Sequence, residues 1–461
     1  MINDTICAIA TPLGSGGIGI VRVSGPQAQS IVEQLFTAAN GTPAQQMETH
    51  KLYYGSIYNK EAALLDRGLC VLMRAPHSYT CEDVAEFQLH GGMGLLGMVL
   101  KACLGCGARL ATPGEFTMRA FINGRLDLSQ AEAVMDIIRA KTPLAVQDSA
   151  DQLEGSLRNF IDQLEQQLVQ LQADIVVGVD FPDDEDAAEN EQVLQQLQCS
   201  AAQMEEKLAG AGEGRIRREG LRCVLCGSVN VGKSSLLNAL LLSERAIVSD
   251  IPGTTRDVIE ETLDLAGVPV VLVDTAGFRD ENSADAVERI GIRRSSNMIE
   301  DAQLVLIVVD AGIGMDEETL RLLEDTAHKP RLLVINKTDL HPAEQLKQDL
   351  AQKLPEQDII CISAKQKQGL SELSSAMLRK AGLNMDAEAS SSLIANSRHE
   401  QALRRALDSV NSAIDGLSFG MGADIVSIDI ENALQALGEI SGKRASDEVL
   451  HNVFSRFCLG K

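Results

Sequence analysis

The chain has 461 residues, 45% of them apolar, with a formal net charge of −24 and an isoelectric point near 4.7. This length predicts about three domains with real cores, and the acidity argues against a broad, non-specific grip on nucleic acid while leaving room for a local basic strip or a basic partner. No run of about 18 apolar residues predicts a membrane span. The first apolar run lacks the basic residues of a signal peptide and the cysteines are scattered, so we expect a cytoplasmic protein.

Residues 1–120 combine short strand-like runs with Gly-rich turns, as in "ICAIAT", "GIGIVRVSG" and "LYYGSIY", together with one helix. They predict an α+β domain. Two cysteine pairs, Cys103/Cys106 and Cys223/Cys226, have the CxxC spacing of zinc ligands. "LRCVLCG" around the second pair is typical of a buried strand, and it favours core packing over a four-thiolate metal site.

Residues 121–215 show the period of helices instead. Apolar side chains recur every three or four residues from 153 to 175 as one stripe on a long helix, and again from 194 to 208. The glycines of Gly210–Gly214 then predict the end of the helix and a linker. A further apolar stripe lies in residues 385–461, so we predict one helical domain that is split in sequence.

Between the two helical parts, residues 216–384 alternate apolar strands with helical patterns. The strand-like runs are "LRCVLCG", "VVLVDTAG", "LVLIVVDA", "RLLVIN" and "IICIS". This alternation predicts a doubly wound parallel sheet, inserted into the helical domain.

"GSVNVGKS", residues 227–234, follows a strand and opens a helix, which is the setting that a P-loop requires. Backbone N–H groups and the helix N-terminus would cradle phosphates. Lys233 would reach the β- and γ-phosphates, and Ser234 would bind Mg²⁺ with Thr255 of "GTTRD" as a second contact. "DTAG", residues 274–277, would place a carboxylate near the metal and an N–H near the γ-phosphate.

"NKTD", residues 336–339, selects the base. Asp339 can accept hydrogen bonds from N1–H and the exocyclic amine of guanine, and adenine offers neither donor there. A buried carboxylate left unpaired by ATP would cost roughly 1–3 kcal/mol. "SAK", residues 363–365, completes the base pocket, and the ordered motifs predict a guanine-nucleotide domain.

The residue after "DTAG" is Phe278, where Ras-like GTPases have a Gln that orients the attacking water. Phenylalanine cannot hold a water, so hydrolysis would need another water positioner and another positive charge. The side-chain carbonyl of Asn230 is either a ligand for a monovalent cation between the phosphates or an ordinary loop residue. Four acids follow closely, and spacing does not choose among them: Asp280, Glu281, Asp285 and Glu288.

Over its whole length the chain resembles the MnmE (TrmE) family of tRNA modification GTPases. The resemblance rests on "GGIGIVRVSG", "SYTCEDVAEFQLHGG", "PGEFTMRAFINGRLDLSQAEAV", "VDFPDDE", the order GTTRD–DTAG–"VERIGI" and the terminal "FCLGK". It implies an N-terminal folate-binding and dimerisation domain (1–120), a discontinuous helical domain (121–215 and 385–461) and an inserted Ras-like P-loop GTPase domain (216–384).

The resemblance also implies an activity and its partners. A homodimer would hydrolyse GTP with K⁺ activation. With an FAD-dependent partner, MnmG (GidA), in a heterotetramer or larger complex, it would add a carboxymethylaminomethyl or aminomethyl-type group to the wobble uridine of certain tRNAs. The N-terminal domain would bind a 5-formyl-tetrahydrofolate-type ligand.

Carried over by motif, K⁺ would be bound by Asn230, Ser249, Ile251 and Thr254, and Mg²⁺ by Ser234 and Thr255. Glu288 would position the water beside Lys233. The folate contacts would be Arg22, Glu86, Arg125 and Lys461, with Cys458 near the one-carbon centre, although position 125 commonly carries Lys in the family. The GTP-binding residues would be Asn230, Val231, Gly232, Lys233, Ser234, Ser235, Ser249, Thr254, Thr255, Asp274, Thr275, Ala276, Gly277, Asn336, Lys337, Asp339, Ser363, Ala364 and Lys365.

An alternative is a regulatory switch in ribosome assembly that binds RNA only when loaded with GTP. Such a protein would carry a KH or OB-type module. The sequence shows no KH-type GxxG loop in a suitable setting and no basic strip, and the acidic charge also disfavours this alternative.

We expect the Glu288→Ala variant to lose GTP hydrolysis by roughly 10²–10⁴-fold, the usual contribution of a water-positioning or general-base group. Nucleotide affinity should stay normal, because the carboxylate acts on water and not on GTP. Phosphate release and fluorescent-GTP titration would measure the two properties. Wild-type turnover in this variant would move the role to another acid, Asp280 or Asp285 first.

Overall fold

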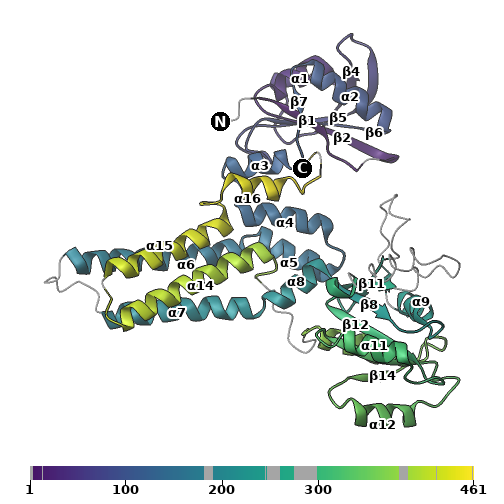
Figure 1. The fold of residues 1–461 in the computed structure, drawn as a ribbon. Helices are drawn as coiled ribbons and strands as arrows, with labels where there is room; N and C mark the ends of the chain where they lie inside the picture. Colours follow the sequence, from purple (N-terminus) through teal and green to yellow (C-terminus); the bar gives the residue numbers. More distant parts are fainter. Residues whose placement is uncertain are drawn as a thin grey trace, which may run out of the picture. The chain divides into compact units, whose positions relative to one another are not determined.

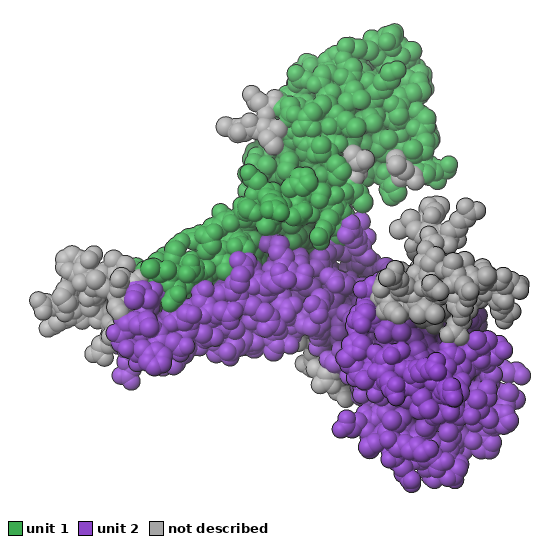
Figure 2. All heavy atoms as spheres, viewed as in Figure 1, with its two compact units in different colours: residues 1–135, 152–180, 427–461 green, residues 136–151, 181–426 purple. Residues whose placement is uncertain are grey.

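The computed structural model describes residues 4–12, 14–180, 190–243, 245–246, 260–274, 298–383, 393–421, 423–458 and 460. The chain divides into two compact units, shown in Figure 2: residues 1–135, 152–180 and 427–461 form one, and residues 136–151 and 181–426 form the other.

The first unit contains a seven-stranded sheet in the order β3-β4-β5-β6-β2-β1-β7 (Figure 1). Neighbouring strands are antiparallel except for β1 and β7. Its strands are β1 (Ile6–Ile9), β2 (Gly16–Ser24), β3 (Phe36–Ala38), β4 (Tyr53–Tyr58), β5 (Leu64–Met73), β6 (Val84–Gly91) and β7 (Arg109–Leu110), and its helical elements are α1 (Ala28–Leu35), η1 (Ala44–Gln46), α2 (Met93–Gly105) and α3 (Glu115–Ile122).

The prediction of a single helix in residues 1–120 was wrong, because α1, α2 and the start of α3 all lie there. Helix α1 is only two turns long, with Ile31, Val32 and Leu35 buried on one face. Helix α2, "MGLLGMVLKACLG", is apolar almost all round, so it carries little helical period. It packs so closely on β2 that a Cβ at Gly19 would lie 2.7 Å from the Leu96 side chain.

A buried ion network fastens α3 to the sheet. The Arg119 side chain is 1% exposed and donates to Asp4 Oδ1 at 2.7 Å, to Glu115 Oε1 at 2.9 Å and to Glu82 at 3.1 Å. Glu115 is equally buried and also accepts from Arg109 and from the Thr112 amide. Burial alone would raise the pKa of the Glu115 carboxyl, but the hydrogen bonds from Arg109 and the Thr112 amide outweigh it and lower that pKa to about 2.

The remaining helices of the described chain outside the second sheet are α4 (Leu128–Arg139), α5 (Pro143–Leu153), α6 (Ser156–Asp180), α7 (Asn190–Ala209), α8 (Ala211–Glu219), α14 (Ser397–Ser418), α15 (Ala423–Ser441) and α16 (Asp447–Phe454). In the first unit, Lys443 at the end of α15 reaches Asp162 of α6 at 2.7 Å. In the second unit, α7 and α14 pack against each other.

Two helical expectations need correction. The stripe from 153 to 175 is not one helix, because Leu153 ends α5 and α6 begins at Ser156, after Gly155 with a φ of +98°. The glycines at 210–214 do not form a linker either. Only Gly210 separates α7 from α8, and α8 contains the other two glycines; its arginines are held by acids, with Arg218 Nε 2.8 Å from Asp136 Oδ2.

The second unit contains a seven-stranded sheet in the order β14-β13-β12-β8-β11-β10-β9, parallel except at β10 and β9. Its strands are β8 (Leu221–Cys226), β9 (Arg245–Ala246), β10 (Glu260–Leu265), β11 (Val268–Asp274), β12 (Leu304–Asp310), β13 (Arg331–Asn336) and β14 (Ile359–Cys361), and its helices are α9 (Lys233–Ser243), α11 (Glu317–Asp325), α12 (Glu344–Lys353) and α13 (Leu370–Lys380). The predicted fold class, with its α+β, split helical and doubly wound parts, is confirmed. The boundaries between the four predicted segments stay a prediction.

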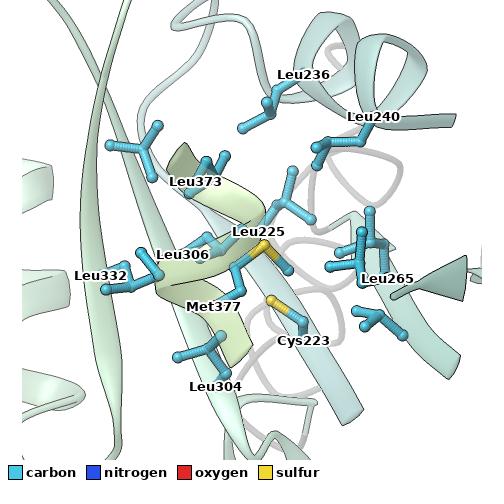
Figure 3. Close-up of a cluster of buried hydrophobic side chains, with 14 of the residues drawn as sticks. Cys223, Leu225, Leu236, Leu240, Leu265, Leu304, Leu306, Leu332, Leu373 and Met377 are labelled. Carbon is cyan, nitrogen blue, oxygen red and sulfur yellow. The ribbon is translucent and has the colours of Figure 1, made fainter. Parts of the chain in front are cut away.

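Both faces of this sheet are buried. On one face, Leu236 of α9 and Met377 of α13 pack against Cys223, Leu225 and the neighbouring strands (Figure 3). Cys226 lies in the core on the other face, where burial raises the pKa of its thiol to about 12. Because Cys223 and Cys226 face opposite ways, this CxxC pair cannot share a metal ion, and core packing explains it.

The connection between α4 and α5, together with the first turn of α5, contacts the hairpin formed by β10 and β11. Lys141 Nζ donates to Thr262 Oγ1 of β10 at 3.2 Å. The hairpin turns at Ala266 and Gly267, both with positive φ, and a Cβ at Gly267 would lie 3.2 Å from Leu144 Cβ. Within the part of the chain that the structure describes, we find no helix with the length and apolarity that crossing a bilayer requires.

The Glu115 network predicts an acid-sensitive N-terminal domain. A carboxylate whose pKa falls from 4.5 to about 2 on folding stabilises the fold fully above pH 4.5, by up to about 3 kcal/mol, and loses this contribution as the pH falls toward 2. Glu115→Gln should therefore unfold more easily than wild type at pH 7, and the gap should shrink between pH 4.5 and 2.

Tyrosine fluorescence would follow this domain alone, because the chain has no Trp and its four Tyr all lie in residues 53–79. Denaturant titrations at several pH values would give the free energy of unfolding. Glu61→Gln, at an exposed glutamate, is the matched control. A gap that stays constant down to pH 2 would contradict the assignment.

Candidate functional site

The P-loop, Gly227–Ser234, joins β8 to α9 and has the tight backbone that its glycines predict. Gly227 has a φ of +146°, and a Cβ there would lie 2.3 Å from the Val308 carbonyl oxygen. A Cβ at Gly232 would lie 2.4 Å from Asn336 Nδ2. Lys233 is 8% exposed, and its ammonium donates to the Gly227 and Ser228 carbonyls, both at 2.8 Å. The Lys233 side chain therefore folds back over the loop and binds the carbonyls at its beginning.

Two of the residues predicted near Mg²⁺ are in direct contact. Ser234 Oγ, in the first turn of α9, donates to Asp274 Oδ2 at 2.8 Å. Asp274 ends β11 and is 6% exposed. A hydroxyl and a carboxylate are the oxygen donors that Mg²⁺ prefers beside nucleotide phosphates, so this pair fits the ion.

The base-binding motifs converge on the P-loop. Asn336, at the end of β13, donates from Nδ2 to the Val231 carbonyl at 3.0 Å and accepts the Ala364 N–H on Oδ1 at 3.1 Å. Asp339 Oδ1 accepts a hydrogen bond from the buried Ser363 hydroxyl at 2.7 Å. One amide thus ties the P-loop to the "SAK" loop, and the "SAK" serine orients the carboxylate that was predicted to select guanine. Ser235 and Lys365 are exposed.

Lys337 connects the same motif to Asn230. Its ammonium donates to the Asn230 carbonyl at 2.6 Å and pairs with Asp310 Oδ2 at 2.8 Å. Burial alone would raise the pKa of Asp310, but the hydrogen bond from Lys337 outweighs it and the pKa lies below its usual value. Sequence reasoning missed Asp310, although its place at the carboxyl end of a fully buried parallel strand was a signal for it.

Several predicted site residues lie outside the described residues: Ser249, Ile251, Thr254, Thr255, Thr275, Ala276, Gly277, Phe278, Glu288 and Lys461. The K⁺ ligand set, the second Mg²⁺ contact and the water positioner therefore stay predictions.

In the N-terminal domain, three predicted folate contacts lie around one aromatic ring. Arg22 and Glu86 are cross-strand neighbours on β2 and β6, with Arg22 Nε 2.8 Å from Glu86 Oε1. The guanidinium carbons of Arg22 and Arg125 lie 5.9 and 5.4 Å from the centroid of the Tyr79 ring. Arg22 also donates to the Gly460 carbonyl at 3.4 Å, which places the C-terminal tail beside the same cluster.

A cavity of about 520 Å³ adjoins this cluster and is lined by Tyr79 and Arg125 among others. Sequence reasoning missed Tyr79, whose hydroxyl lies 2.9 Å from Thr117 Oγ1 and whose pKa burial raises. Phe454 and Phe457 are buried and their rings contact each other, so they anchor the tail by packing. Cys458 beside them is exposed.

A mainly parallel sheet with a P-loop, a Ser–Asp pair suited to Mg²⁺ and an Asn–Lys–Asp base motif defines a P-loop guanine-nucleotide-binding protein. The model of the MnmE helical domain matches residues 128–458, and that of the GTP-binding protein TrmE N-terminus matches residues 5–125. The chain belongs to the MnmE family.

Relatives match over their full length. The chain is 45% identical to the tRNA modification GTPase MnmE of Symbiobacterium thermophilum and 43% identical to that of Carboxydothermus hydrogenoformans, covering 100% of both chains in each case. Among solved structures, Era of Aquifex aeolicus is 25% identical over 41% of this chain and 66% of that chain, with a TM-score of 0.30.

We expect Asp339→Asn to weaken GTP binding roughly 10- to 100-fold and to favour xanthosine triphosphate, because the amide can donate where the carboxylate only accepts. Competition of the two nucleotides against fluorescent GDP would measure the preference. Asp349→Asn, at an exposed aspartate on α12, should behave as wild type. Unchanged preference for GTP in the Asp339 variant would mean that the base pocket is misassigned.

Proposed function

We propose that this chain is a K⁺-activated GTP hydrolase that acts in tRNA wobble-uridine modification. With an FAD-dependent partner of the MnmG type, it would add a carboxymethylaminomethyl or aminomethyl-type group to certain tRNAs. The observation that carries the proposal is the hydrogen-bonded link from the P-loop through Asn336 to the guanine-selecting Asp339 and Ser363, in a chain of the MnmE family.

In the proposed hydrolysis, each residue has a separate task. Lys233 would neutralise the β- and γ-phosphates, and Ser234, Asp274 and Thr255 would hold Mg²⁺. Mg²⁺ would supply positive charge to the bridging phosphate oxygens. Since Phe278 cannot orient a water, Glu288 takes that role. The ligands proposed for K⁺ are Asn230, Ser249, Ile251 and Thr254.

The left-handed backbone of Asn230 supports its proposed role. It has a φ of +65°, and the Lys337 ammonium already takes up its main-chain carbonyl. The side chain is exposed and so stays available to a cation at the phosphates. Lys337 thereby holds Asn230 in place without supplying the positive charge itself.

The cluster around Tyr79 supports a folate-type ligand. Arg22 and Arg125 suit the carboxylates of such a ligand, Glu86 suits its amine-bearing ring, and Tyr79 offers an aromatic face. A 5-formyl-tetrahydrofolate-type ligand would supply the one-carbon unit, with Lys461 as a further contact. Arg125 lines the cavity and lies over the Tyr79 ring, which supports it as a contact for such a ligand.

The proposed assembly is a cytoplasmic homodimer bound to MnmG in a heterotetramer or larger complex. The charge of −24 bears on how tRNA joins it. An acidic surface repels the phosphate backbone, so a basic partner would carry much of the RNA contact. Wobble-nucleoside analysis of tRNA from a deletion strain tests the function directly. Loss of the modified wobble uridine would support the proposal, and normal wobble nucleosides would favour a ribosome-assembly switch.

We expect GTP turnover in KCl to exceed that in NaCl at equal ionic strength by at least tenfold, since the positive charge that an arginine finger supplies at this position is worth roughly 10³–10⁵ in rate and K⁺ would supply charge there instead. Asn230→Ala should abolish the difference between the salts. Asn238→Ala, at an exposed position on α9, is the control and should retain it. Equal wild-type rates in the two salts would overturn the cation assignment.

Cys458→Ser should keep K⁺-stimulated GTP hydrolysis, because the thiol lies in the tail beside the N-terminal cluster and not in the nucleotide site. It should reduce modified wobble uridine in tRNA, measured by nucleoside mass spectrometry in a complemented strain. The exposed Cys199, changed to Ser, is the matched control. Wild-type modification by the Cys458 variant would limit the tail to ordering the folate pocket.

A further inference from the structure

The second residue of the P-loop is joined to a helix outside every nucleotide motif. Ser228 is 8% exposed, and its hydroxyl donates to Asp316 Oδ2 across 88 positions of sequence. The other oxygen, Asp316 Oδ1, accepts the Thr319 N–H at 2.8 Å and the Thr319 hydroxyl at 2.6 Å. Asp316 is the N-cap of α11. One carboxylate therefore caps a helix and holds the P-loop at the same time.

The charge of this carboxylate is compatible with a neighbouring phosphate site. The hydrogen bond from Ser228 and those from Thr319 hold the pKa of Asp316 below its usual value, so it is ionised at neutral pH. Three donors and the positive end of the α11 dipole face its two oxygens. The negative charge is thus taken up locally and does not oppose an anion in the loop.

Asp316 complements two other anchors of the loop. Lys337 holds the carbonyl of Asn230, and Asn336 holds that of Val231. Both of these belong to the base-binding motif and fasten the later part of the loop. Asp316 fastens its beginning through a side chain, Ser228.

We propose that Asp316 is a positioning residue that holds the P-loop in its nucleotide-binding conformation through Ser228. The inference rests on the proposed function only for guanine-nucleotide binding, and it is independent of potassium, folate and tRNA. A loop already held at residues 228, 230 and 231 presents its N–H groups to the phosphates with less further ordering cost. Without the Ser228 contact, the beginning of the loop gains freedom and bound GDP leaves faster.

The test is the dissociation rate of a fluorescent GDP analogue from the full chain, measured by stopped flow. Ser228→Ala removes the loop contact and keeps the α11 cap. Thr319→Val is the matched control, because it removes the other hydroxyl from the same carboxylate and leaves the loop contact intact. We expect GDP release roughly tenfold faster in Ser228→Ala, in line with a lost hydrogen bond to a charged group, and within twofold of wild type in Thr319→Val.

A double-mutant cycle separates positioning from general loss of stability. Asp316→Ala should accelerate GDP release as Ser228→Ala does, and the double variant should release GDP no faster than either single variant. The midpoint temperature of thermal unfolding, recorded in parallel, should fall for both Thr319→Val and Asp316→Ala. Only Asp316→Ala should also release GDP faster, so the loss of stability does not by itself explain the faster release.

Wild-type GDP release from Ser228→Ala, additive effects in the double variant, or equally fast release from Thr319→Val would each overturn the inference and leave the proposed function standing. A wild-type chain that bound no GDP would instead overturn the proposed function, and the inference with it.

Discussion

The nucleotide site depends on one buried amide. Asn336 is 2% exposed and uses both ends of its side chain, donating to the P-loop at Val231 and accepting from the "SAK" loop at Ala364. These loops lie more than a hundred residues apart in sequence and follow different strands. A carboxylate at this position could not donate, and a hydrophobic residue could do neither, so the phosphate end and the base end are held at a fixed spacing by an Asn side chain.

The same logic of buried polar groups operates in the N-terminal domain. Arg119 is 1% exposed, and its guanidinium meets three carboxylates from separate parts of the chain. Removing one partner from such a group leaves a charge without its solvent and without its counter-ion. The network therefore fixes α3 on the sheet, and α3 in turn supplies Phe116 and Thr117, which contact Arg22 and Tyr79 in the candidate folate cluster.

Much of the fold follows from local patterns in the sequence. The run "LRCVLCG" becomes β8, and the P-loop glycines stand where a side chain would collide with Val308 or Asn336. The number of helices in residues 1–120 and the break at Gly155 were not predicted, and α2 and Gly155 show the physical reasons. A helix that is apolar almost all round has no period to detect. The spacing of three and four residues between apolar side chains also continues from Leu153 to Leu157, so it hides the break at Gly155.

Some residues of the candidate sites could be predicted from local motifs, and others could be found only in the structure. The closeness of Ser234 and Asp274 was predicted from their motifs, which encode a known local geometry. The motifs also assigned Asn336 to the nucleotide site, and its links to Val231 and Ala364 emerged only in the structure. Asp316 and Tyr79 belong to no such motif, and their roles arise from contacts with Ser228 and with Arg22 and Arg125 far away in sequence. A single sequence carries no record of these tertiary contacts, since aspartate before a helix and tyrosine in a loop are common for ordinary reasons.

The β10–β11 hairpin connects the nucleotide site to the start of α5, since it contacts Lys141 and Leu144 at one end and leads to Asp274 at the other. Strand β10 follows the segment that carries Thr255, and β11 ends at Asp274. The hairpin therefore leads directly to Asp274, which contacts Ser234 of the P-loop. The hairpin turn lies against Leu144 at Gly267, and Lys141 donates a hydrogen bond to Thr262 on the side of the hairpin. Because Gly267 has no side chain, the backbone of the hairpin turn packs directly against the Leu144 side chain of α5. A larger residue at position 267 would push the hairpin and α5 apart.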